Sequence, residues 1–364
     1  MEIQPTSGTV VGVLSFLGQE ELWSPMNRTS KLVNTICIVS SFAFCISAGA
    51  YQTPQPQAFA DAAKTPMPTE ALWRDRGDVA SLNLLYGPGE KGHQPTGKFM
   101  FVKEDKEGTA PKFEVVDEQG VRWKAKLGAE AQSETAATRL VWAAGYFTDE
   151  DYYLPELAVA NMPELSRGRE FVSAGGVVRR VRLERNIRGQ KKSGNWSWFK
   201  NPFVRTRELS GLKVMMALIN NWDLKDVNNA IYEEKGQGPR YAVSDLGATF
   251  GETGNAITRS KSNQKDYADS KFVQKVTPDH VDFILASRPF ALAAVNVPYY
   301  TSRTHMQDIV KDIPTADVKW LGKLLKQLSD EQLRDCFRAA GYSPEEVEGY
   351  AAEVKERIRA LNEL

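Results

Sequence analysis

The chain has few of the residues that build metal centres or disulfide frameworks. It contains three His and three Cys among 364 residues, and the motifs C-x-x-C, H-E-x-x-H and G-x-S-x-G do not occur. These absences argue against a zinc site and against Ser-His hydrolysis. An excess of positive charge is also lacking, because 46 Lys and Arg balance 46 Asp and Glu. Overall charge therefore gives no reason to expect a nucleic-acid partner.

The amino terminus has the order of a secretory signal peptide. Basic and polar residues from position 26 precede an apolar run at 32–46, and small residues follow up to Ala50. The apolar run, about 15 residues, is shorter than the roughly 20 that span a bilayer. We expect residues 26–50 to be a signal peptide and residues 1–25 an over-extended start. The mature protein is then exported, to the periplasm or the extracellular space, without a stable membrane span.

Signal removal and composition set the next two expectations. Cleavage after residue 50 takes away Cys37 and Cys45 and leaves Cys336 alone, so no internal disulfide can form. Residues 51–70 hold four prolines among Gln, Thr and Ala, which predicts a disordered linker. Residues 71–97 are read as a turn-rich lead-in.

The remainder predicts a sheet and one helix, followed by helices. Apolar residues alternate from residue 98, and two such runs flank a turn at Gly120, as in a hairpin. Helical spacing at 129–146 follows, with Gly145 as its stop. Near the carboxyl end, capped helix starts at Ser329 and Ser343 precede two apolar stripes. We expect an amino-terminal lobe at 98–186 and a carboxyl-terminal lobe at 187–364.

Two short polar motifs carry the chemistry. Residues 223–228 read D-L-K-D-V-N, and Asp245-Leu246-Gly247 begins seventeen positions beyond Asn228. Phosphoryl transfer depends mainly on positioning and charge neutralisation. A carboxylate beside the nucleophile, with an Asn and an Asp on magnesium, supplies much of what it needs. The order of these motifs therefore favours a phosphotransferase.

A third motif completes a family likeness. The text from Lys126 reads K-x-G-x-E-A-x-x-E-T-A-A-x-R-L. With W-D-L-K-D-V-N-N and S-D-L-G, it resembles the atypical protein-kinase-like superfamily. That group includes HipA-type kinases, type II phosphatidylinositol 4-kinases, and secreted kinases of the Golgi casein kinase and CotH groups. The likeness covers residues 98–364. It implies an α+β bilobal protein-kinase-like fold, with a small antiparallel sheet and one helix in the first lobe and a mainly helical second lobe.

The resemblance also implies roles. Asp223 would be the catalytic base, Asn228 and Asp245 the metal ligands, Lys126 the phosphate-binding lysine and Glu134 its partner. Two competing choices, Lys124 and Glu130, remain open at this stage. The sequence departs from ordinary kinases at Asn221-Trp222, in place of His-Arg, and at Leu246, in place of Phe. Both departures fall at packing positions.

A glycine turn can supply backbone N–H groups to phosphates. The turn containing Gly108, Thr109 and Lys112 lies between two predicted strands, so we assign it to nucleotide binding. Residues 87–92 spell G-x-G-x-x-G and residues 92–98 spell G-x-x-x-x-G-K. Both signatures require a helix immediately afterwards, whereas a strand is predicted here, so neither is taken as a nucleotide site.

These expectations define a hypothesis and its rivals. The chain would transfer the ATP γ-phosphate to a hydroxyl acceptor, with a protein Ser or Thr favoured, using Mg2+ or alternatively Mn2+. The alternative is an exported pseudokinase, or a nucleotide-binding or structural protein without transferase activity. A basic and aromatic stretch at 188–203 could bind nucleic acid or anionic lipid. We favour a loop pinned by its aromatic side chains, because the net charge is zero.

Overall fold

The computed structural model describes residues 67–108, 110–253, 259–285 and 297–364. The predicted over-extended start, the signal peptide and the linker up to residue 66 lie outside the described residues. Within the described ranges, no helix is both long enough and apolar enough to cross a bilayer.

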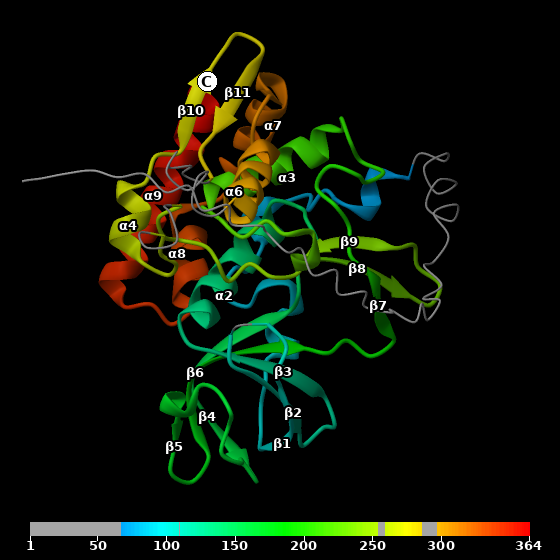
Figure 1. Cartoon of the computed structure of the whole chain (residues 1–364), viewed down its shortest axis with the longest axis vertical. Helices are drawn as coiled ribbons and strands as arrows, with labels where there is room; N and C mark the ends of the chain where they lie inside the picture. The colour runs from blue at the N-terminus through cyan, green and yellow to red at the C-terminus, as the bar shows by residue number, and fades with distance from the viewer. Residues whose placement is uncertain (1–66, 109, 254–258, 286–296) are drawn as a thin grey trace, which may run out of the picture. The chain divides into compact units, whose positions relative to one another are not determined.

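The first sheet closes on itself (Figure 1). Its strands run in the order β3-β2-β1-β4-β6-β5, and β3 also pairs with β6, which joins β1, β2, β3, β6 and β4 in a ring. Neighbours are antiparallel except β1 and β4, which are parallel over a short stretch. The strands are β1 (Phe99–Asp105), β2 (Lys112–Asp117), β3 (Arg122–Leu127), β4 (Asp151–Ala160), β5 (Val172–Ser173) and β6 (Val177–Arg185).

The predicted hairpin joins β2 to β3. Gly120 has a φ of 78°, a conformation that glycine adopts without steric cost. The Asp117 carboxylate accepts hydrogen bonds from the backbone N–H groups of Gln119 and Val121 and from Trp123 Nε1. Asp117 therefore fixes both the turn and the first buried aromatic ring of β3.

Helix α2 (Ala129–Ala143) follows β3 after Gly128, whose φ is 87°. Nearly all of its side chains are buried, because strands β3, β4 and β6 and helix α8 (Asp330–Arg338) all contact it. A helix buried on most sides lacks a single polar face. The helix ends at Ala143, and Gly145, just beyond the C-cap residue, has a φ of 98°, so glycine stops the helix as the sequence predicts.

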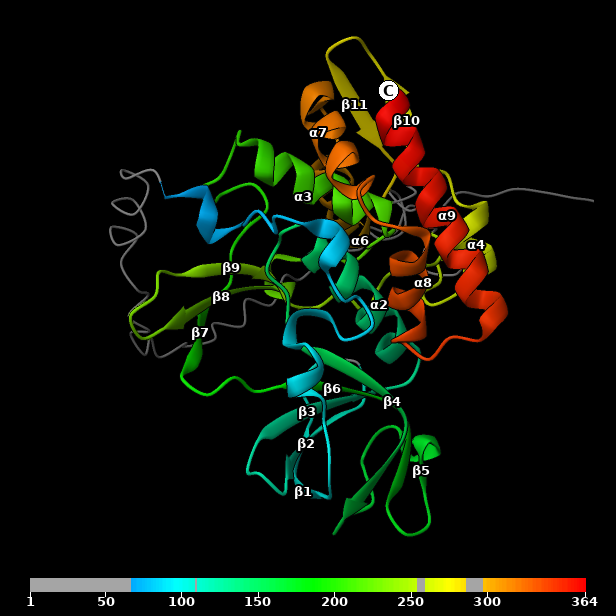
Figure 2. The same cartoon turned by 180° about the vertical axis from the view of Figure 1, so that it is seen from behind.

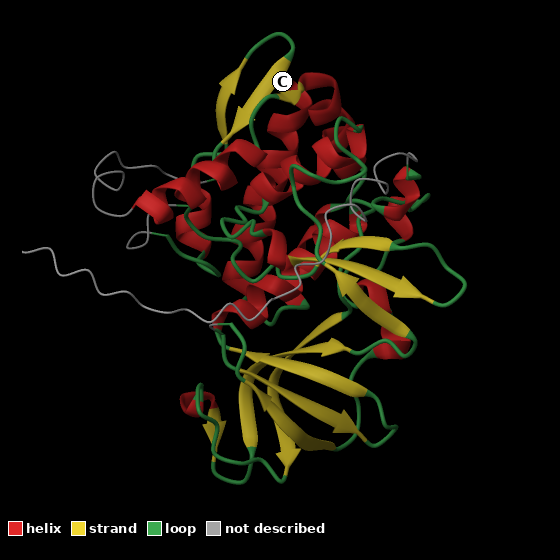
Figure 3. Cartoon of the chain, turned by 45° about the vertical axis from the view of Figure 1, so that its right-hand side comes forward, coloured by secondary structure: helices red, strands yellow, loops and turns green. Residues whose placement is uncertain are grey.

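The rest of the chain is mainly helical, with two small sheets (Figure 3). The predicted caps at Ser329 and Ser343 are confirmed, since each makes a complete capping box. The further helices are α3 (Arg207–Leu218), α4 (Gln264–Asp269), α6 (Val297–Ile309), α7 (Thr315–Leu325) and α9 (Pro344–Glu363). The further strands are β7 (Gln190–Gly194), β8 (Asn229–Glu234), β9 (Arg240–Val243), β10 (Val273–Val276), β11 (His280–Phe283) and β12 (Ile313–Pro314).

These elements confirm the predicted fold class. A sheet with one helix precedes a mainly helical part, which is the α+β, bilobal kinase-like arrangement. The sheet β7-β8-β9 places both polar motifs, because β8 starts directly after Asn228 and β9 ends two residues before Asp245.

Two features set aside from the sequence are consistent with the structure. Residues 87–92 form short 3-10 turns, η3 (Gly87–Gly89) and the start of η4 (Lys91–His93), and β1 follows rather than an α-helix. In the basic and aromatic stretch, Trp196 and Trp198 are buried and pack edge to face. The stretch is therefore anchored by two core side chains.

Candidate active site

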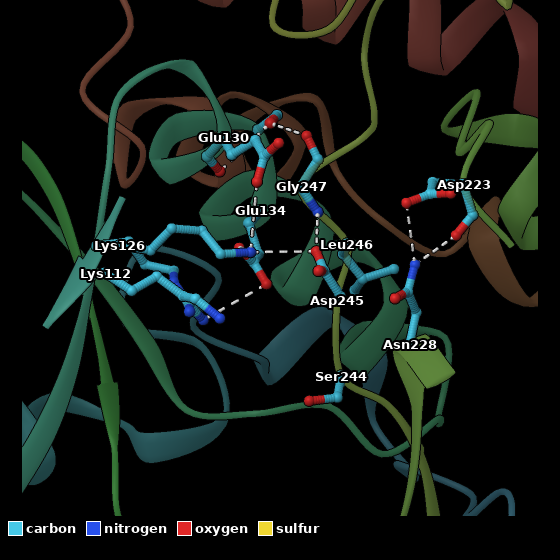
Figure 4. A network of polar contacts seen from close by, with 12 residues as sticks. Lys112, Lys126, Glu130, Glu134, Asp223, Asn228, Ser244, Asp245, Leu246 and Gly247 are labelled. Carbon is cyan, nitrogen blue, oxygen red and sulfur yellow. Dashed lines mark hydrogen bonds and ion pairs between the residues drawn. The ribbon is translucent and has the colours of Figure 1, made fainter. Parts of the chain in front are cut away.

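Lys126 is the centre of a group of carboxylates (Figure 4). It is the second-last residue of strand β3, and its side chain is only 6% exposed. Its Nζ atom is 2.8 Å from Glu134 Oε2, 3.1 Å from Asp245 Oδ1 and 3.6 Å from Glu130 Oε2. Glu130 and Glu134 reach the same ammonium because residues four apart in a helix share one face. The structure thus brings together Lys126, Glu134 and Asp245 from β3, α2 and the segment after β9.

The geometry distinguishes the two candidate glutamates. Glu134 is closer to Lys126 than Glu130 is, and its side chain is 1% exposed against 16% for Glu130. Glu130 also contacts Lys261, which follows the D-L-G motif. Its stem packs against Gly247, where a Cβ atom would lie 3.0 Å from Glu130 Cβ. Glu134 is therefore the buried partner, and Glu130 links Lys126 to the following segment.

Mutual charge sets the protonation of this group. Burial acts to lower the pKa of Lys126, but Glu134 and Asp245 outweigh it and raise that pKa. Burial acts to raise the pKa of the Asp245 carboxyl, yet Lys126 and the Gly247 amide bring it below its ordinary value. Lys126 is thus protonated and Asp245 ionised near neutral pH. For Glu134, burial raises the pKa, and Arg182 and Lys126 oppose it.

Asp223 and Asn228 form the second part of the site. The Asn228 amide nitrogen donates to the Asp223 backbone oxygen at 2.6 Å and to Asp223 Oδ2 at 3.3 Å. Asn221 Oδ1 accepts from the Asp223 backbone N–H at 3.1 Å, which helps fix the turn. Lys225 Nζ lies 2.7 Å from Asp223 Oδ1. Lys225 was not singled out from the sequence, although its position two residues after Asp223 is a usable signal.

The backbone joins the two motifs. The backbone carbonyl oxygen of Asn228 accepts hydrogen bonds from the backbone N–H groups of Ser244 and Asp245, at 3.0 and 3.1 Å. Asp245 Oδ1 accepts from the Gly247 N–H at 3.2 Å, and Leu246 is fully buried. Residues from two distant stretches therefore sit side by side at the end of β9 (Figure 4).

The predicted phosphate loop is held by other side chains. Gly108 has a φ of 64°, and its carbonyl oxygen accepts from Arg167 Nη1 at 2.6 Å. Lys112 pairs across from Lys126 in the sheet, while its Nζ atom lies 3.4 Å from Asp105 Oδ2. Thr109 lies outside the described residues. Arg167 was not foreseen, because it comes from the loop between β4 and β5.

A buried charge network behind Lys126 was also missed. Arg182 Nη1 lies 2.6 Å from Asp151 Oδ1 and 3.5 Å from Glu134 Oε1. Its Nη2 atom lies 3.1 Å from Glu184 Oε2. Lys124, the competing lysine, pairs with Glu184 at 3.4 Å and is 42% exposed. Arg182 lies between the buried Val181 and Leu183 of β6, so alternation places its side chain on the other face of the strand and does not predict that it is buried.

A cavity of about 230 Å³ adjoins this network. Lys124, Glu184, Asp149 and Tyr232 are among its lining residues. The Asp149 carboxylate accepts from Tyr232 Oη at 2.8 Å and from Ser244 Oγ at 2.6 Å. Burial, together with Glu184, raises the pKa of Asp149 to about 7. The cavity is thus polar, bounded by strands β3, β6 and β8.

No protein-family model and no curated protein matches the chain. Among solved structures, it is similar to the proinflammatory kinase CtkA of Helicobacter pylori, with 11% identity and a TM-score of 0.42, over 74% of this chain and 98% of that one. It is similar to the Golgi casein kinase with Mn/ADP bound, with 9% identity and a TM-score of 0.37, over 74% and 72%. A second Golgi casein kinase structure gives 10% identity and a TM-score of 0.31, over 79% and 76%.

All three of these solved structures are kinases, the class of protein that the motifs resemble. Because each TM-score is below 0.5, the roles proposed next are derived from the side chains of this chain alone.

Proposed function

We propose that the chain is an exported, magnesium-dependent kinase that transfers the γ-phosphate of ATP to a hydroxyl acceptor. One observation carries this proposal. Lys126 Nζ lies between Glu134 Oε2 at 2.8 Å and Asp245 Oδ1 at 3.1 Å, and the Asn228 backbone oxygen binds the Asp245 N–H. A buried cation held by a helix carboxylate, beside an Asp and an Asn, is the constellation that positions a triphosphate.

Each side chain then has a distinct role. Lys126 would bind phosphate oxygens, with Glu134 holding its ammonium in place. Asp223, whose carboxylate is 25% exposed, would orient the acceptor hydroxyl and take up its proton. Lys225, which pairs with Asp223, would provide a second cation that stabilises negative charge on the transferred phosphoryl group. The cavity lined by Lys124 and Glu184 would receive the nucleoside.

The donor set fits magnesium. Asn228 uses its amide nitrogen for Asp223, so its carbonyl oxygen is directed away, on the side of Asp245 (Figure 4). The Asp245 side chain is 45% exposed, which leaves carboxylate surface for an ion. Carboxylate and amide oxygens are the ligands that Mg2+ prefers, and Mn2+ accepts the same set. When bound, the ion would neutralise negative charge on the phosphates.

The acceptor and the location are parts of the same proposal. We favour a protein Ser or Thr as the acceptor over a small molecule. Export rests on the signal-peptide pattern at residues 26–50.

The decisive experiment incubates the purified chain with γ-labelled ATP and Mg2+ or Mn2+, with and without generic protein acceptors. Asp223→Asn should abolish transfer. Asp226→Asn is the matched control, because Asp226 accepts the Trp198 N–H at 3.2 Å through Oδ1, an interaction that Asn can keep. Far-UV circular dichroism should show both variants folded.

Nucleotide binding without transfer by the wild type would favour the pseudokinase alternative. Absence of binding, with a folded protein, would indicate that the motifs have a structural role. Full activity of Asp223→Asn would remove the role assigned to that carboxylate.

A further inference from the structure

A segment upstream of the first strand runs along the side of α2 (Figure 2). We call residues 72–90 the strap. Leu72, Val79 and Leu84 of the strap are buried in the same hydrophobic cluster as Leu140 and Val141 of α2. Only two of the buried α2 residues, Leu140 and Val141, carry large apolar side chains, and the other buried apolar residues are alanines, which remove little apolar area from water. Restraint from outside therefore matters more for this helix than for one lined by large apolar residues.

The strap also provides donors for the carboxyl end of α2. The last carbonyls of a helix have no partner within it. Arg76 Nε donates to the Trp142 backbone oxygen at 3.0 Å, and Arg76 Nη2 donates to the Tyr146 backbone oxygen at 3.1 Å. Trp73 Nε1 donates to the Ala144 oxygen at 2.7 Å. A cation at this position also interacts favourably with the helix dipole.

The strap is itself tied to both parts of the chain. Gln332 of α8 donates from Nε2 to the backbone oxygens of Val79 and Leu82, each at 2.9 Å. Tyr152 of β4 donates from its hydroxyl to the Glu90 oxygen at 2.9 Å. The strap that carries the donors Trp73 and Arg76 is thus itself held by hydrogen bonds to α8 and β4.

We propose that the strap is a positioning element that holds α2, and with it Glu134, against Lys126, and that Arg76 is its principal positioning residue. This rests on the proposed kinase function, since Lys126 binds phosphate only when Glu134 fixes it. Among the contacts that restrain the helix are the Lys126–Glu134 pair on its inner face and the strap at its carboxyl end. Loss of the strap contacts would let the helix shift and would weaken the Lys126–Glu134 pair.

The test compares Arg76→Ala with Arg74→Ala. Arg74 is a matched control, because it carries the same charge two residues away and is exposed, while the bond from its backbone N–H to the Gly145 oxygen survives the substitution. Hydrogen exchange of the α2 amides is measured together with kcat and the KM for ATP. For Arg76→Ala we expect exchange near the carboxyl end of α2 to accelerate by about tenfold or more. We expect kcat/KM to fall by about 10- to 100-fold, with a raised KM for ATP.

The KM value separates positioning from simple destabilisation. A variant that is merely less stable loses active molecules, which lowers apparent kcat and leaves KM unchanged. Arg76→Lys keeps the charge and can reach one carbonyl, so it should recover part of the effect. Should Arg76→Ala fail to fold, Trp73→Phe removes the bond to the Ala144 backbone oxygen, keeps an aromatic ring beside Trp320, and should show the same changes on a smaller scale.

Unchanged α2 exchange in Arg76→Ala, or faster exchange with kinetic constants equal to those of Arg74→Ala, would overturn the proposal. A wild type that neither binds ATP nor transfers phosphate would instead disprove the proposed function. In that case the exchange measurement still decides whether the strap restrains α2.

Discussion

Lys126 Nζ donates a hydrogen bond to Asp245 Oδ1 at 3.1 Å, although 119 positions separate the two residues in the chain. The contact joins the end of β3 to the segment that follows β9. It also keeps the Asp245 pKa low, so the carboxylate is ionised at neutral pH and available to a cation.

Lys126→Met should reduce ATP binding and phosphoryl transfer by at least about 100-fold, because it removes the buried cation that would meet the phosphates. It should also lower the free energy of unfolding by about 1 to 3 kcal/mol, since Glu134 loses its closest partner. Lys124→Met is the comparison, because Lys124 is the competing lysine. It is 42% exposed, pairs with Glu184 and lines the proposed nucleoside cavity, so its loss should weaken ATP binding less than the loss of Lys126 does. Nucleotide titration and urea unfolding measure both effects. A larger loss in Lys124→Met would reassign the phosphate-binding lysine.

Glu134→Gln should lower kcat/KM for ATP by about 10- to 100-fold, because the neutral amide holds Lys126 less firmly. Glu130→Gln should have only a few-fold effect, since Glu130 is more exposed and lies 3.6 Å from Lys126. The two substitutions change the same chemical group on one helix face, so steady-state kinetics compares them directly. Equal effects would mean that both carboxylates hold the lysine.

Asp245→Asn should weaken the binding of Mg2+ more than the binding of the nucleotide. The substitution removes one negative charge from the donor set and leaves an amide oxygen, so the Mg2+ concentration for half-maximal activity should rise by about 10- to 100-fold. The measurement is a Mg2+ titration at saturating ATP. An unaltered titration would show that the ion binds elsewhere.

Asp149→Asn should change the pH dependence of stability. The folded-state pKa of Asp149 is raised to about 7, whereas an unfolded Asp titrates near 3.9. The folded protein therefore binds one more proton than the unfolded chain between about pH 4 and pH 7. Stability from this group is fully present below pH 4 and is lost as the pH rises through 7, by up to about 4 kcal/mol in total.

The free energy of unfolding of the wild type, relative to Asp149→Asn, should accordingly fall from pH 4.5 to pH 7.5, by about 1.4 kcal/mol per unit over the central part of that range. Urea unfolding at several pH values measures the difference. Asn can still accept from Tyr232 or Ser244, so the fold should survive. A difference that stays constant with pH would mean that Asp149 does not titrate in this range.

Local patterns predict much of the fold. The hairpin at Gly120, the stop of α2 at Gly145 and the caps at Ser329 and Ser343 all have a short-range cause, and each occurs in the structure. Strand β4 was not expected, because Pro155 interrupts it and its buried positions do not alternate. It forms through pairing with β6 and β1, which are distant in the chain. Tertiary partners decide such a strand, and a local window does not contain them.

The site divides in the same way. Motif spacing drew attention to Lys126, Glu134, Asp223, Asn228 and Asp245. It left the choice between Glu134 and Glu130 open, because both lie on one helix face and only burial distinguishes them. Arg182 and Arg167 were missed, since their contacts join residues far apart in sequence. Single charged residues on strands and loops are usually solvated, so nothing local marks these two as buried or anchoring.

Gly247 packs against Glu130, and its carbonyl oxygen accepts from Ser133 Oγ at 2.7 Å. Thr249 Oγ1 donates in turn to the Ser133 oxygen at 3.3 Å. These contacts therefore link the first turns of α2 to the D-L-G segment, and the two would move as one rigid unit. A displacement of the helix would carry the Asp245 carboxylate with it, so the lysine partner and the metal ligand would enter or leave their working positions in a single event.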